Sequence, residues 1–131
     1  MSVALSSENR AASVEARRVL VVEDEYLISE LIAEQLSELG CHVVGPALSL
    51  EEGRRLIAEA PFDVALLDWS IEGAGSGELA DTLQKLRIPF LFVTGFDEPP
   101  DPRYREVTVL NKPFDLGGLK AALEKALRTI V

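Results

Sequence analysis

The chain has 131 residues, with 22 Asp or Glu residues against 13 Lys or Arg residues and a formal net charge of −9 at pH 7. This length favours one domain around a single core, because domains most often contain about 100 to 150 residues. The negative charge repels phosphate backbones and anionic lipid headgroups, so we expect neither nucleic acid nor a membrane surface as a partner.

The apolar runs and the cysteine content indicate the cellular compartment of the protein. The longest apolar runs are strand-sized, well short of the about 18 to 20 residues that span a membrane. The first residues also lack the apolar stretch of a signal peptide. Cys41 is the only cysteine, so no disulfide can form within the chain, as in a reducing compartment. These features predict a cytoplasmic protein.

The expected strands are short apolar runs rich in β-branched residues. Residues 1–17 are rich in Ser, Ala and Glu with weak periodicity, and there we expect a flexible extension or an add-on helix before a domain over residues 18–131. The strands are expected within that domain. They are residues 18–23, 41–45, 62–67, 89–94 and 106–111.

The first two expected helices have recognisable ends. Apolar residues at helical spacing over 28–39 predict a helix that ends at Gly40. Ser49 and Glu52 form a capping box that opens a second helix, which must stop before Pro61.

The remaining pattern completes an alternation of strands and helices. Residues 79–86 predict a third helix, and Asp115 can cap a last helix whose apolar face extends to Ile130. The alternation predicts an α/β fold with a parallel sheet and helices on both faces. Before the fifth strand, the stretch "GFDEPPDPRYR" contains three prolines, so the helix expected there is short, displaced or absent.

Polar side chains stand where four of the strands end. The apolar run "DVALLDWS" leads directly into a carboxylate, and the ends of the other strands carry further charges or a hydroxyl. Ligands bind beyond the carboxyl ends of parallel strands, so we expect these side chains to form one site. They are Glu23, Asp24, Asp68, Thr94 and Lys112.

Three carboxylates gathered at one edge require a cation. Two of them about 4 Å apart repel by about 4 kcal/mol at an effective dielectric constant of about 20. Oxygen ligands without histidine or cysteine favour Mg²⁺, with Mn²⁺ as an alternative. A metal, Lys112 and Thr94 would together surround a phosphoryl group, and Asp68 is the candidate nucleophile because Glu23 and Asp24 form the natural metal pair.

These motifs resemble those of response-regulator receiver domains. The resemblance covers the chain from about Arg18 to Val131 and rests on "VLVVEDE", "ALLDWS", "FVTGF" and "LNKPF". It implies a flavodoxin-like, doubly wound, five-stranded parallel sheet in the order 2-1-3-4-5, here with a short or displaced fourth helix.

The resemblance also implies roles for the acidic residues. Asp68 would be the phosphoacceptor, receiving a phosphoryl group from a phosphohistidine of a histidine kinase in a Mg²⁺-dependent reaction. Asp24, Asp68 and the backbone carbonyl of Ser70 would hold the metal, and Glu23 would act directly or through water.

Lys112, Thr94 and an aromatic residue would form the switch. By resemblance, Lys112 would pair with the phosphoryl group and precede a cis bond to Pro113, while Thr94 would move toward the phosphoryl group. The stretch "PFLFVTGF" resembles the FAT-GUY subgroup of single-domain receivers, in which Phe96 would be the switch aromatic.

Two positions depart from the common receiver pattern. Glu72 occupies a position four residues after Asp68 that is often proline, within the Gly-rich "IEGAGSG", so we expect an unusually mobile loop after the third strand. Val109 stands where many receivers carry an aromatic residue three positions before the lysine, which puts the usual Thr–Tyr coupling in doubt.

The resulting interpretation is a single-domain phosphoacceptor that is not an enzyme apart from catalysing its own phosphorylation and dephosphorylation. It would signal to a downstream protein or phosphotransferase through the face formed by strand 4, helix 4 and strand 5, or act as a relay intermediate or phosphate sink, as a monomer or a phosphorylation-dependent dimer. One alternative is an aspartate-nucleophile phosphohydrolase, although Ser70 stands where such enzymes carry a second acid. The other is a pseudo-receiver that binds a partner without phosphorylation.

Overall fold

The structure is a computed structural model of the chain and describes residues 13–95 and 101–129. Phe96, the expected switch aromatic, lies outside the described residues. Among those that are described, every helix is too short or too polar to cross a bilayer.

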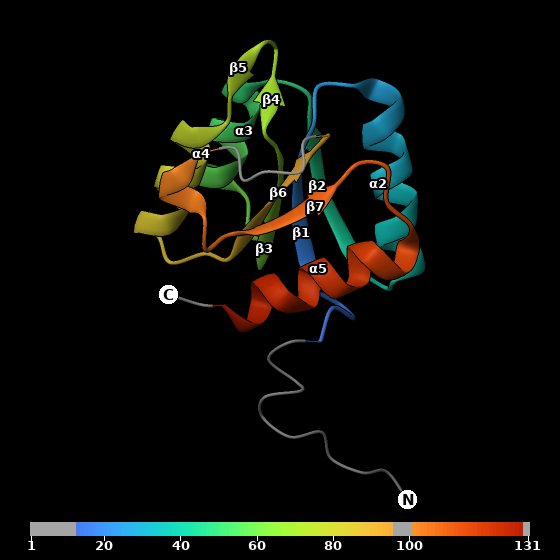
Figure 1. Ribbon diagram of the computed structural model, residues 1–131. Coiled ribbons are helices and arrows are strands. Elements are labelled where there is room, and N and C mark those ends of the chain that lie inside the picture. Colours follow the sequence, from blue (N-terminus) through green and yellow to red (C-terminus); the bar gives the residue numbers. More distant parts are fainter. Residues whose placement is uncertain (1–12, 96–100, 130–131) are drawn as a thin grey trace, which may run out of the picture.

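Five parallel strands form the central sheet, in the order β2-β1-β3-β6-β7 (Figure 1). Numbered among themselves, these strands have the predicted order 2-1-3-4-5, so the predicted fold class is confirmed. The second strand continues two residues beyond its predicted end at Gly45. The strands are β1 (Arg18–Val22), β2 (His42–Ala47), β3 (Val64–Asp68), β6 (Phe90–Thr94) and β7 (Thr108–Asn111).

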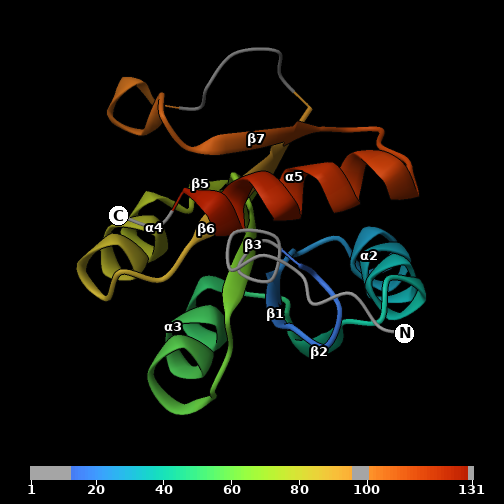
Figure 2. The same ribbon diagram turned by 90° about the horizontal axis from the view of Figure 1, so that it is seen from below.

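Helices cover both faces of the sheet (Figure 2). On one face lie α2 (Tyr26–Glu38) and α5 (Leu116–Arg128). On the other lie α3 (Leu50–Glu59) and α4 (Gly77–Lys85). The Ser49 side chain accepts a hydrogen bond from the N–H group of Glu52, as the capping box predicts.

Alternating residues of the strands divide the core between these two layers. In β1, Val19 and Val21 pack toward α2 and α5, whereas Leu20 and Val22 pack toward α3 and α4. All five residues of β3 are buried because that strand lies in the middle of the sheet. This position explains why an uninterrupted apolar run precedes Asp68.

A β-hairpin follows Trp69. It consists of β4 (Ser70–Ile71) and β5 (Ala74–Gly75), joined by Glu72 and Gly73. Both linking residues have positive φ, at 54° and 79°, as the two central residues of a type I′ turn require. Ile71 is fully buried, so the Gly-rich loop that we expected to be mobile has a regular, anchored conformation.

Between β6 and β7, the described residues contain only a 3₁₀ helix, η1 (Pro102–Tyr104). The prediction of a short or displaced fourth helix is confirmed. Tyr104 is buried against α4, and its ring lies 5.4 Å from that of Phe92 on β6. One aromatic side chain therefore covers sheet surface that the apolar face of a helix would otherwise cover.

Residues 13–17 pack against the domain. Val14 is buried in the core beside α2 and α5, and its carbonyl group accepts a hydrogen bond from the Cys41 thiol. Ala16 donates a backbone hydrogen bond to the carbonyl group of Gly40. Part of the segment that we expected to be an extension therefore contributes to the core.

Substitution Val14→Ala tests this contribution. Removing two buried methyl groups should lower the free energy of unfolding by about 1 to 2 kcal/mol in urea denaturation. Leu27→Ala, at a side chain that is 80% exposed, should change it by less than about 0.5 kcal/mol. Equal effects of the two substitutions would contradict the packing of Val14.

Candidate functional site

The residues expected to form a site stand at the carboxyl ends of four neighbouring strands. Figure 1 shows how these strands lie side by side in the sheet. Glu23 and Asp24 directly follow β1, and Asp68 is the last residue of β3. Thr94 is the last residue of β6, and Lys112 directly follows β7. Because parallel strands in register end at the same edge of the sheet, residues far apart in the sequence share this edge.

Glu23, Asp24 and Asp68 form a compact acidic cluster. One carboxylate oxygen from each residue lies within 4.8 Å of the other two. Glu23 is fully buried and Asp68 is 6% exposed, so water does little to screen their repulsion. The three oxygen ligands and their spacing fit a small divalent cation such as Mg²⁺, which binds carboxylates and retains waters.

Lys112 supplies positive charge beside this cluster. Its Nζ atom lies 2.9 Å from Oε1 of Glu23 and 3.5 Å from Oδ2 of Asp68. Burial alone would lower the pKa of Lys112, but its hydrogen bonds to Glu23 and Asp68 and their charges outweigh burial and raise that pKa. The side chain is therefore a fixed cation within reach of the candidate phosphoacceptor.

Asp68 has an unusual protonation equilibrium in the metal-free protein. Burial raises the pKa of its carboxyl group to about 7, and a hydrogen bond with Glu23 and the charge of Glu23 act in the same direction. Lys112 opposes these effects without cancelling them. A bound cation would favour the charged form, which is the form required of a nucleophile.

The β4–β5 hairpin holds Asp24 in place. The backbone N–H group of Glu72 donates a hydrogen bond of 2.8 Å to Oδ2 of Asp24. The side chain of Glu72 in turn accepts a hydrogen bond from the N–H group of Leu50, at the start of α3. Sequence reasoning did not predict this contact, because Glu72 was noted only as a departure from a common proline.

The remaining expected site residues that the structure describes are Thr94, Pro113 and Ser70. Thr94 is buried, and its carbonyl group accepts a hydrogen bond from the N–H group of Lys112. The bond between Lys112 and Pro113 is cis. Ser70, the expected carbonyl ligand, is exposed and begins the hairpin two residues after Asp68.

The family of the chain follows from comparison with known proteins. Residues 19–124 match the model of the response regulator receiver domain, and the chain belongs to this family. Its relatives include the transcriptional regulatory protein PdtaR of Mycobacterium tuberculosis, which is 32% identical over 116 residues. That alignment covers 85% of this chain and 57% of PdtaR. The chain spans about half the length of this and other curated relatives.

Solved structures show the same fold. The solution structure of SdrG from Sphingomonas melonis has a TM-score of 0.77 and 32% identity, covering 88% of this chain and 98% of SdrG. A BeF3-activated conformation of SdrG has a TM-score of 0.75 and 31% identity, covering 86% and 98%. The anti-anti-sigma factor PhyR from Bartonella quintana has a TM-score of 0.74 and 28% identity, covering 90% of this chain and 50% of PhyR.

Removing a carboxylate from the cluster should stabilise the metal-free protein. In EDTA, Asp68→Asn should raise the free energy of unfolding by about 1 kcal/mol above pH 7, because it removes a buried charge beside Glu23. Between about pH 4 and pH 7 the folded wild-type protein retains a proton on Asp68 that the unfolded chain releases, so the wild-type protein loses stability as the pH rises through this range. In denaturation curves, the free energy of unfolding of Asp68→Asn should therefore exceed that of the wild-type protein by an amount that grows with pH and levels off near pH 7.

The control for this prediction is Glu34→Gln, which removes an exposed carboxylate on α2. It should leave stability within about 0.5 kcal/mol of the wild-type value at each pH. Adding Mg²⁺ should stabilise the wild-type and Glu34→Gln proteins by binding the folded state, and should stabilise Asp68→Asn much less. If the difference in free energy of unfolding between Asp68→Asn and the wild-type protein did not change with pH, the raised pKa of Asp68 would be contradicted.

Proposed function

We propose that this receiver domain is a phosphoacceptor of two-component signalling and that Asp68 carries the phosphoryl group. The observation that supports this most directly is the cluster of Glu23, Asp24 and Asp68 with Nζ of Lys112 3.5 Å from Asp68. A carboxylate nucleophile between a metal-binding pair and a fixed cation is suited to phosphoryl transfer.

The proposed donor is a phosphohistidine of a histidine kinase. A carboxylate oxygen of Asp68 forms a bond to phosphorus as the bond between phosphorus and the imidazole nitrogen breaks, and the electron pair of that bond remains on the imidazole. The product is an acyl phosphate. Glu23, Asp24, Asp68 and the carbonyl group of Ser70 would hold Mg²⁺, which when bound supplies charge neutralisation for the transferred group.

Two residues of the chain would stabilise the phosphoryl oxygens. Lys112 is held by Glu23 at a site where its ammonium group can also reach an oxygen on Asp68. Thr94 ends the neighbouring strand, and we propose that its hydroxyl group binds a second oxygen. The fold holds Lys112 in place before the reaction, so this cation needs little rearrangement during phosphoryl transfer.

We propose that the output is a change in the surface formed by β6, η1 and β7. Thr94 and the β6–β7 segment are continuous in the chain, so movement of Thr94 toward a phosphoryl group would displace that segment. A BeF3-activated conformation is known for the similar protein SdrG, which supports by similarity a change of conformation on activation. Signal output, phosphorelay and phosphate storage are all compatible with one acceptor residue.

A pseudo-receiver that binds its partner without phosphorylation is the second candidate. Similarity to PhyR, an anti-anti-sigma factor, favours it, because such a factor acts on another protein. The two candidates differ in one measurable property, the formation of an acyl phosphate on Asp68.

Intact mass spectrometry after incubation with acetyl phosphate and Mg²⁺ tests the proposal. We expect the wild-type protein to gain one phosphoryl group, and we expect no gain in EDTA or in Asp68→Asn. Lys112→Met should reduce the labelled fraction at least about tenfold, because the developing charge loses its fixed cation.

Glu34→Gln is the matched control and should be labelled as fully as the wild-type protein. Labelling of Asp68→Asn to the wild-type extent would place the acceptor elsewhere. If the wild-type protein is labelled neither by acetyl phosphate nor by a panel of phosphorylated histidine kinases, the pseudo-receiver would replace the phosphoacceptor.

A further inference from the structure

A pocket lies far from the acidic cluster, at the amino-terminal ends of β6 and β7. In Figures 1 and 2 the last turns of α4 and α5 approach this end of the sheet. The pocket has a volume of about 210 Å³. Its lining includes Arg87, Ile88, Phe90, Val107, Ala126 and Thr129.

The interior of the pocket is apolar. Ile88 and Phe90 come from the start of β6 and the residues before it, Val107 precedes β7, and Ala126 lies on the inner face of α5. Sites for drug-sized small molecules occupy about 300 to 1,000 Å³, so a pocket of 210 Å³ is small for such a ligand. It is close to the size of a single large apolar side chain, which is the typical anchor of a protein interface.

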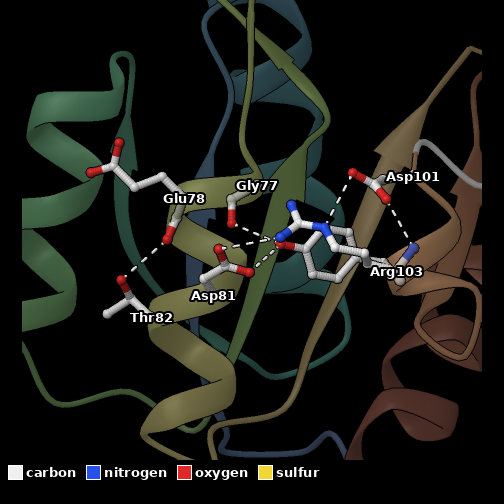
Figure 3. Close-up of polar contacts among 7 residues, drawn as sticks. Gly77, Glu78, Asp81, Thr82, Asp101 and Arg103 are labelled. Carbon is white, nitrogen blue, oxygen red and sulfur yellow. Dashed lines mark hydrogen bonds and ion pairs between the residues drawn. The ribbon is translucent and has the colours of Figure 1, made fainter.

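One wall of the pocket is held rigidly. Arg103 lies 3.4 Å from a carboxylate oxygen of Asp101 and 3.8 Å from one of Asp81, and its guanidinium group stacks at 5.0 Å from the centre of the Tyr104 ring (Figure 3). The Tyr104 hydroxyl group lies within hydrogen-bonding distance of both the Asp81 carboxylate and the carbonyl group of Gly77, and its one proton is shared between these acceptors. These contacts fasten η1 to α4 and fix the position of Arg103.

The rim of the pocket carries several cations that form no ion pair within the described residues, together with one carboxylate, Glu106. Arg87 is exposed and forms no ion pair with any residue that the structure describes. The segments that border the pocket also carry Lys85, Arg105 and Arg128, and these too form no ion pair within the described parts of the chain. Glu106 is the one carboxylate among the described residues that line the pocket, so the cations outnumber it. In a protein with a net charge of −9, this end therefore offers cations to an external acidic group.

We propose that this pocket is the docking site for an acidic segment of a partner protein that inserts one large apolar side chain. The apolar interior would bury the anchor, and Arg87 with its neighbouring cations would contact the flanking carboxylates. Docking here requires no phosphoryl group, so it can be tested independently of the role of Asp68.

Titration with defined peptides tests the docking site. The probe is the acetylated, amidated peptide Glu-Glu-Asp-Phe-Asp-Glu-Glu, with versions that carry Leu or Trp in place of Phe. We expect at least one of them to shift the backbone NMR signals of Ile88, Val107 and Thr129 in the unphosphorylated full chain. The titration is made at about 0.15 M salt, which screens unspecific attraction between distant charges.

Control peptides separate the two parts of the site. The Ser version of the acidic peptide lacks the anchor, and Lys-Lys-Lys-Phe-Lys-Lys-Lys lacks the acidic charges. We expect neither to shift the three pocket signals. If the Ser or Lys peptide shifts them as strongly as the probe, or if no acidic probe shifts them, the proposal is wrong.

A pair of charge reversals tests the role of the rim. Arg87→Glu should weaken binding of the best probe at least about fivefold, because it replaces an attractive charge by a repulsive one. Lys120→Glu makes the same change of charge at an exposed residue near the other end of α5 and should weaken binding less than about twofold. Equal weakening by both variants would indicate unspecific attraction and would overturn the assignment of the pocket.

Discussion

Repulsion among three carboxylates at one edge of the sheet is the interaction on which the site depends. Glu23 is fully buried and Asp68 nearly so, and burial together with the charge of Glu23 raises the pKa of Asp68. The fold tolerates this arrangement because Lys112 bonds to Glu23 and the hairpin bonds to Asp24. The repulsion lowers the stability of the metal-free protein. Binding a cation and a phosphoryl group relieves it, and this relief contributes to the free energy of binding.

Strand order and the convergence of the polar residues could be predicted from the sequence because both follow from local patterns. The apolar run before Asp68 indicated a strand buried on both faces, and β3 lies in the middle of the sheet. Parallel strands bring their carboxyl ends together whatever their loops do, so one residue at the end of each strand was enough to place Asp68 beside Lys112.

Features that depend on contacts between distant segments could not be predicted. The Gly-rich composition after Asp68 indicated mobility, but burial of Ile71 and the bond from Glu72 to Asp24 stabilise a hairpin there. Val14 lies in a segment with weak periodicity, and its burial depends on the shape of the core beside Cys41. One buried residue in an irregular segment is not repeated at helix or strand spacing, so sequence periodicity cannot reveal it.

Tyr104 gives the segment before β7 an uncommon tolerance to change. A helix packed on a sheet constrains every third or fourth residue of its sequence. In residues 101–107, by contrast, the Tyr104 ring packs against Phe92, and contacts of Tyr104 and Arg103 fasten the segment to α4. The neighbours of Tyr104, such as Arg105 and Glu106, are exposed. Natural variation can therefore remodel the outer surface of this segment, residue by residue, while the interior of the domain remains unchanged.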